Sequence, residues 1–168
     1  RWLQGFSEAM KVAALLPDTQ VVSVADREAD MFELFDFRRR QSGRKAELLI
    51  RAKTDRCLET TEAKLFEELA AAPLAQKVSI PVPRQREHRS KPSDPGRIAL
   101  AARQAQVEIR YKRVTLSAPQ AAQTRNLQPL TLWAIYILEK NPPAGATGAA
   151  KPERGPGVRC RGCGRRAR

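Results

Sequence analysis

The feature that most constrains this fold is a short apolar run followed at once by charged residues. Residues 21–25 are rich in β-branched side chains and nearly all apolar, and Asp26, Arg27 and Glu28 come next. A short run that is apolar on both faces is typical of a strand inside a parallel sheet. The sequence therefore predicts a buried strand that ends at Asp26.

The residues after this strand predict a βαβ unit. Residues 27–40 change to the helical period, with Asp36 and Arg40 spaced to form an ion pair, and residues 41–43 end the helix. Residues 48–52 are again a short apolar run and predict a second buried strand. A strand, a helix and a strand within roughly thirty residues form a βαβ unit, whose crossover we expect to be right-handed.

The remaining segments predict two more helices, several half-exposed strands and an irregular end. Helical spacing is present over residues 6–16, and Thr61 is placed to cap a helix over residues 61–70. Apolar and polar residues alternate, or β-formers dominate, in three further segments, which predict antiparallel strands: 78–82, 107–112 and 130–138. The composition after residue 141 is too poor in apolar residues to form a core, so we expect a disordered basic tail.

The charge of the chain indicates an anionic partner. The chain has 31 Lys and Arg against 18 Asp and Glu, a formal net charge of +13. Basic side chains that neutralise phosphates release counterions, which makes a nucleic acid the expected partner rather than an acidic protein. No apolar run approaches the roughly 20 residues of a membrane helix, and no charged and then apolar leader opens the chain, so we expect a cytoplasmic protein.

Two interpretations of Asp26 stay open at this point. Asp is a favoured helix N-cap, because its side-chain oxygen accepts a hydrogen bond from an orphan backbone N–H group. A carboxylate at the carboxyl end of a core strand is also a suitable ligand for a hard cation such as Mg²⁺. Both roles require the same side chain, so they coexist only if it is shared.

The residues around Asp26 carry a resemblance to a known family. The segment Asp-Arg-Glu-Ala-Asp-Met-Phe-Glu-Leu-Phe at residues 26–35 resembles the signature of bacterial DDE transposases of the insertion-sequence-four group, the relatives of the Tn-five transposase. The resemblance extends less strictly through residues 2–5, 48–53 and 137–143, and covers about the first 145 residues.

This resemblance implies a fold, a site and a cofactor. It implies an α/β protein with a partial RNase H-like core (βαβ), an antiparallel β insertion subdomain and a disordered basic tail, which we place at residues 1–76, 77–140 and 141–168. In the family, three carboxylates hold two Mg²⁺ ions, which cleave and transfer DNA strands. Asp26 resembles the second of the three. Neither the upstream Asp nor the downstream Tyr-x-x-Arg-x-x-x-Glu helix is found in this sequence, so we expect the chain alone to be inactive.

Two groups of basic residues are candidates for contact with DNA. Arg51 and Lys53 match the Arg-x-Lys that follows the next core strand in the family, and solvated strand-end charges are the alternative interpretation. A basic segment lies where relatives carry the β insertion, and an ordinary solvated loop is equally consistent with its sequence. Its candidate residues are Arg84, Arg86, Arg89 and Lys91.

Three other features receive structural interpretations. Trp133 lies in a strand-like run, so we expect it to pack in the core rather than to stack on a base. His88 has no partner for nucleophilic catalysis, and we expect it to be exposed. Cys160 and Cys163 have the spacing of half a zinc site, which would need a partner chain to supply the other ligands.

The resemblance therefore implies a truncated DDE transposase whose intact relative binds transposon-end DNA, with a frameshift near residues 145–148 as the explanation of the tail. It would act in the cytoplasm at the bacterial nucleoid, and its protein partner would be a second copy or a full-length transposase. The alternative is a non-enzymatic DNA-binding protein that regulates transposition. A third interpretation is an unstable product with no role.

Overall fold

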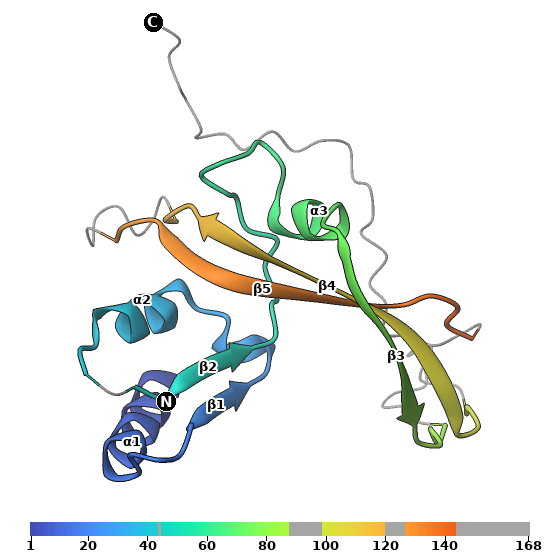
Figure 1. Cartoon of the computed structure of the whole chain (residues 1–168), viewed down its shortest axis with the longest axis horizontal. Coiled ribbons are helices and arrows are strands. Elements are labelled where there is room, and N and C mark those ends of the chain that lie inside the picture. Colours follow the sequence, from blue (N-terminus) through green and yellow to red (C-terminus); the bar gives the residue numbers. More distant parts are fainter. Residues whose placement is uncertain (44, 88–98, 120–126, 144–168) are drawn as a thin grey trace, which may run out of the picture. The chain divides into compact units, whose positions relative to one another are not determined.

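The computed structural model describes residues 1–43, 45–87, 99–119 and 127–143. They form a mixed α/β protein with a two-stranded parallel sheet and a three-stranded antiparallel sheet (Figure 1). The chain divides into two compact units. The first contains Arg1–Lys64 and Thr115–Leu132, and the second contains Leu65–Val114 and Trp133–Arg168.

The first unit contains the predicted βαβ arrangement. Strand β1 (Val22–Ala25) is followed by helix α2 (Phe32–Arg40) and strand β2 (Glu47–Ile50), and β1 and β2 pair in parallel (Figure 1). The register places Val22 opposite Glu47 and Ala25 opposite Ile50. The prediction of two neighbouring parallel strands is therefore confirmed, although β2 ends two residues earlier than predicted.

The core of this unit lies where two helices meet one face of the sheet. Helix α1 (Trp2–Leu15) buries Phe6 and Ala13, and α2 buries Leu34. The rings of Phe6 and Phe37 meet edge to face with their centroids 6.2 Å apart. These side chains share one hydrophobic cluster with Ala29 and Ala46, so the cluster joins both helices to the residues that flank the strands.

The helix predicted over residues 27–40 is interrupted near its start. Residues Arg27–Ala29 form a 3₁₀ turn, and Met31 is extended at φ −114° and ψ 129° before α2 begins. The prediction of one continuous helix was wrong, because the Asp30 carboxylate binds backbone groups of a distant segment. The end of α2 agrees better, since Asp36 and Arg40 form the predicted ion pair at 2.7 Å and Gly43 follows with a positive φ of 72°.

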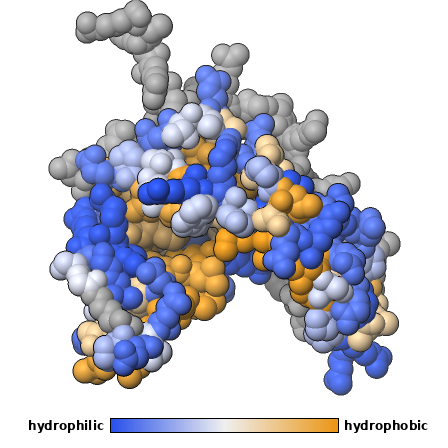
Figure 2. All heavy atoms as spheres, in the orientation of Figure 1, coloured by the Kyte–Doolittle hydropathy of each residue, from blue (hydrophilic) through white to orange (hydrophobic). Residues whose placement is uncertain are grey.

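The other face of the parallel sheet is open to solvent. Val24 is 71% exposed, and Val22 and Leu49 are also exposed. Figure 2 shows hydrophobic side chains at the molecular surface. The expectation of a strand buried on both faces was therefore wrong for the described residues, because the helices of this unit cover only the face that carries Val21, Ala25 and Ile50.

Most of the second sheet, which has three long antiparallel strands, lies in the second unit. Strand β3 (Leu74–Val82) pairs with β4 (Arg103–Leu116), which also neighbours β5 (Leu130–Glu139). The three predicted strands are confirmed, and all are longer than predicted. Their order in the sheet is β3-β4-β5, and the pairing of β3 with β4 shifts between Leu74 and Gln76.

Helix α3 (Leu65–Ala70) belongs to the second unit and begins later than predicted. Thr61 was expected to cap this helix, but its hydroxyl donates a hydrogen bond to the carbonyl oxygen of Ala63 instead. Leu65 and Leu69 are buried, as the helical pattern predicts. The segment that follows the helix is bonded to the sheet by Arg110, whose guanidinium donates to the carbonyl oxygen of Ala72 at 2.5 Å.

The expected core position of Trp133 was wrong. Its side chain is 65% exposed, because β5 alternates between two faces and presents Trp133, Ile135 and Ile137 to solvent. The Trp133 ring meets the exposed ring of Tyr111 edge to face, with centroids 5.8 Å apart. In the part of the chain that the structure describes, no helix has the length and apolar character needed to cross a membrane.

Truncating the core should cost far more stability than truncating the surface. Leu34 is 2% exposed, so we expect Leu34→Ala to lower the free energy of unfolding by about 2–5 kcal/mol through lost burial and a residual cavity. The matched control is Leu15→Ala, because Leu15 is 79% exposed. Urea denaturation followed by circular dichroism measures both. Equal losses in the two variants would contradict the described core.

Candidate functional site

Asp26 lies at the carboxyl end of β1, where the strand gives way to the 3₁₀ turn. Its side-chain Oδ1 accepts a hydrogen bond from the backbone N–H of Glu28 at 3.1 Å, and its backbone is extended. The N-cap interpretation of Asp26 is therefore confirmed, with the cap on the 3₁₀ turn rather than on a long helix. The residue is exposed, and only Oδ1 is engaged by a described residue.

Arg51 lies directly beside Asp26 at the same edge of the sheet. Ala25 and Ile50 are register partners, and the N–H of Arg51 donates to the carbonyl oxygen of Ala25 at 3.1 Å. Lys53 follows in an irregular segment after β2. Both side chains are exposed, and neither forms an ion pair with another residue in the described ranges. One carboxylate and two exposed cations are thus available at this edge.

Asp30 is the residue at this edge that sequence reasoning missed. Its Oδ2 accepts hydrogen bonds from the backbone N–H groups of Lys53 at 2.7 Å and Thr54 at 2.9 Å. Its Oδ1 pairs with Nη2 of Arg56 at 2.6 Å. The side chain is 3% exposed. The sequence pattern gave Asp30 only a place in the helix predicted over residues 27–40, since none of its partners is close to it in sequence.

The environment of Asp30 favours its ionised form. Burial by itself raises the pKa of this carboxyl group. The hydrogen bonds from Arg56, Thr54 and Lys53 and the positive charge of Arg56 outweigh that effect, so the pKa lies below its usual value of 3.8. Asp30 is therefore an ionised and internally satisfied carboxylate at neutral pH.

The other acidic group in the turn is also engaged. The Glu28 carboxylate forms an exposed ion pair with Arg1 at 2.9 Å. No group of three His, Cys, Asp or Glu side chains that could hold a metal ion is present among the residues described. Asp26 alone supplies too few ligands for a centre with two metal ions, so the described residues do not by themselves fit the predicted Mg²⁺ site.

The second group of predicted DNA contacts belongs to the other unit. Arg84 and Arg86 are exposed and follow β3. Arg89 and Lys91 lie outside the described residues, as do His88, Cys160, Cys163 and the predicted tail beyond residue 143. The predictions for these residues therefore remain predictions.

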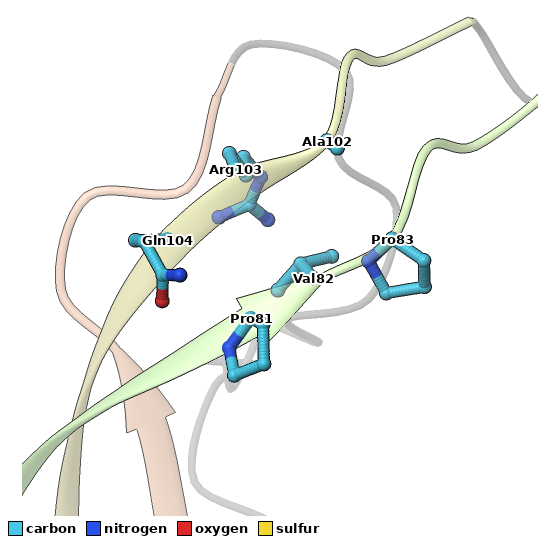
Figure 3. Close-up of a pocket in the computed structure, with 6 residues that line it drawn as sticks. All are labelled: Pro81, Val82, Pro83, Ala102, Arg103 and Gln104. Atoms are coloured by element: carbon cyan, nitrogen blue, oxygen red, sulfur yellow. The ribbon is translucent and has the colours of Figure 1, made fainter.

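A surface depression lies at the ends of β3 and β4. Pro81, Val82 and Pro83 line it from one strand, and Ala102, Arg103 and Gln104 from the other (Figure 3). Nη2 of Arg103 donates to Oε2 of Glu139 at 3.0 Å, so the cation in its wall is already paired. The lining is mostly apolar and offers no carboxylate, nucleophile or unpaired cation for chemistry.

A scan against models of protein families and a search of curated proteins both return no match for this chain.

The stability of the protein should depend on the ionisation of Asp30. Because its pKa is lower in the folded state, the carboxylate contributes stability above the unfolded pKa, near the usual value of 3.8, and that stability is lost as the pH falls through the folded pKa. We expect Asp30→Asn to be less stable than the wild type at pH 7 and to approach it in acid. Urea denaturation at several pH values measures this. A difference in stability between the two proteins that does not change with pH would contradict an ionised Asp30 in the folded state.

Proposed function

We propose that this chain is part of a DDE transposase, whose intact form binds transposon-end DNA and uses Mg²⁺ to cleave and transfer phosphodiester bonds. By itself, the chain binds DNA and does not cut it. We place it at the bacterial nucleoid in the cytoplasm, with a second copy or a full-length transposase as its protein partner.

The observation that carries this proposal is the position of Asp26. The residue lies at the carboxyl end of a strand in a parallel pair, and it opens the ten-residue segment that resembles the transposase signature. Ligands of open α/β sheets collect at this edge, because the loops that follow the strands meet there. Asp26 would be one of the three carboxylates that hold Mg²⁺, with its other ligands supplied from outside the described residues.

The adjacent cations support binding to DNA. Arg51 and Lys53 are exposed at the same edge and have no ion-pair partner in the described ranges. A cation without a carboxylate partner is available to a phosphate, and the net charge of +13 favours a polyanion in general. Arg84, Arg86, Arg89 and Lys91 are proposed as a second group of phosphate contacts.

A non-enzymatic DNA-binding protein that regulates transposition is the second candidate. One observation favours it over an enzyme, namely that the described residues bring one candidate carboxylate ligand to this edge. A cleavage assay and a binding assay separate the two candidates, because the regulator needs only the cations.

Removing the two cations should weaken DNA binding in a salt-dependent way. For each of Arg51→Gln and Lys53→Gln, we expect the slope of log K against log salt concentration to fall in magnitude by about 1, the effect of one lost phosphate contact. The control is Lys11→Gln, which removes another exposed charge, one that pairs with Glu8 on α1. Titration of duplex DNA by fluorescence anisotropy measures the slopes. An equal change in the control would assign binding to overall charge.

The purified chain should not cleave DNA. We expect no Mg²⁺-dependent nicks in supercoiled plasmid above the level of buffer alone, because two metal ions need more ligands than Asp26 provides. Agarose gels of plasmid incubated with Mg²⁺ or EDTA measure this. Nicking that requires Mg²⁺ and is lost in Asp26→Asn would contradict inactivity and favour an enzyme. Asn is an equally good N-cap, so that substitution tests the metal role and spares the turn.

A further inference from the structure

We propose that Asp30 is a positioning residue for DNA binding, which acts by holding Arg51 and Lys53 at the edge of the sheet beside Asp26. This inference rests on the proposed function, because it assumes that the two cations contact phosphate. It adds a buried carboxylate that never touches DNA but determines where the contacts lie.

The segment that carries the two cations is fixed at both ends. At its start, the N–H of Arg51 donates to the carbonyl oxygen of Ala25, which continues the pairing of β1 with β2. Beyond that point the backbone turns to Asp30, whose Oδ2 receives the N–H groups of Lys53 and Thr54. Arg51 and Lys53 therefore lie between two anchors, and the second anchor is a single carboxylate.

Arg56 completes the anchor from the same segment. Its Nη2 donates to Oδ1 of Asp30 at 2.6 Å and to the main-chain oxygen of Asp30 at 2.9 Å. The Arg56 side chain is 13% exposed, so the pair is shielded from water. Breaking a shielded pair by removing one partner is costly, because the other charge is left buried and uncompensated.

The arrangement leaves the other two cations available. Arg56 neutralises Asp30, while the Lys53 side chain takes no part because its backbone N–H makes the bond. Both oxygens of Asp30 are occupied by donors from residues 53–56, so this carboxylate is not available to bind a cation in place of Asp26. Asp30 thus orders the loop without forming an ion pair with Arg51 or Lys53, the cations that would contact phosphate.

The test compares two buried carboxylates in the full chain. Asp30→Asn weakens the anchor. Asp36→Asn is the matched control, because Asp36 is also buried, lies in the same unit and pairs with Arg39 and Arg40 on α2. Both substitutions remove one negative charge, so any general gain in electrostatic attraction is the same. We expect the salt slope of duplex binding to fall in magnitude by about 1 in Asp30→Asn and to stay unchanged in Asp36→Asn.

A double-mutant cycle tests whether Asp30 acts through the cations. In a chain that carries both Arg51→Gln and Lys53→Gln, we expect Asp30→Asn to change DNA affinity no more than Asp36→Asn does. An undiminished effect of Asp30→Asn in that background would overturn the inference. Arg56→Gln serves as a second variant if Asp30→Asn fails to fold, since it removes the ion pair and keeps the backbone hydrogen bonds to Asp30.

Hydrogen exchange tests the anchor without DNA. We expect the amides of Lys53 and Thr54 to exchange about tenfold faster or more in Asp30→Asn than in the wild type, with no such change in Asp36→Asn. Unchanged exchange would overturn the inference whatever the binding data. If Arg51→Gln and Lys53→Gln weaken binding and Asp30→Asn does not, the inference fails and the proposed function stands. If the wild-type chain does not bind DNA, both fail.

Discussion

The parallel pairing of β1 with β2 is the constraint on which the candidate site depends. Because Ala25 and Ile50 are register partners, the residues that follow them, Asp26 and Arg51, must leave the sheet side by side. A shift of the register by one residue would move the core-facing side chains of one strand to the other face of the sheet and separate Asp26 from Arg51. The helices stabilise the pairing from one face, through the cluster around Phe6 and Leu34.

A second constraint comes from one buried carboxylate. The Asp30 carboxylate binds a segment more than twenty residues away in the chain, and the backbone around Asp30 is not α-helical. Helix α2 therefore begins only at Phe32. Burial of the carboxylate is favourable because two backbone N–H groups and a guanidinium together replace the hydrogen bonds to water that it loses. The result is an ordered loop next to Asp26 in place of a strand end that would be free to fray.

The sequence predicts the helices and strands of this protein better than it predicts which of their faces are buried. β-Branched runs and the helical period identify β1, α2, β2 and the three antiparallel strands, because these signals are local. Alternation along β5 shows that Trp133 and Ala134 lie on opposite faces, but it cannot show which face another element covers. Asp30 could not be recognised, since its partners lie far along the chain and an acidic residue near a helix start already has a local explanation. Asp26 was recognised as a cap for that reason, while its proposed role with metal rests on the resemblance and on its position after the end of β1.

The exposed face of the β1–β2 sheet favours association between copies of the protein. Strands β1 and β2 have no third strand beside them among the residues described, and Val22, Val24 and Leu49 leave an apolar surface next to those unpaired edges. Backbone groups on such an edge can accept an extended peptide from a neighbouring molecule. Turbidity on heating should therefore rise with protein concentration, and added salt should increase it, because salt screens the repulsion between molecules of net charge +13.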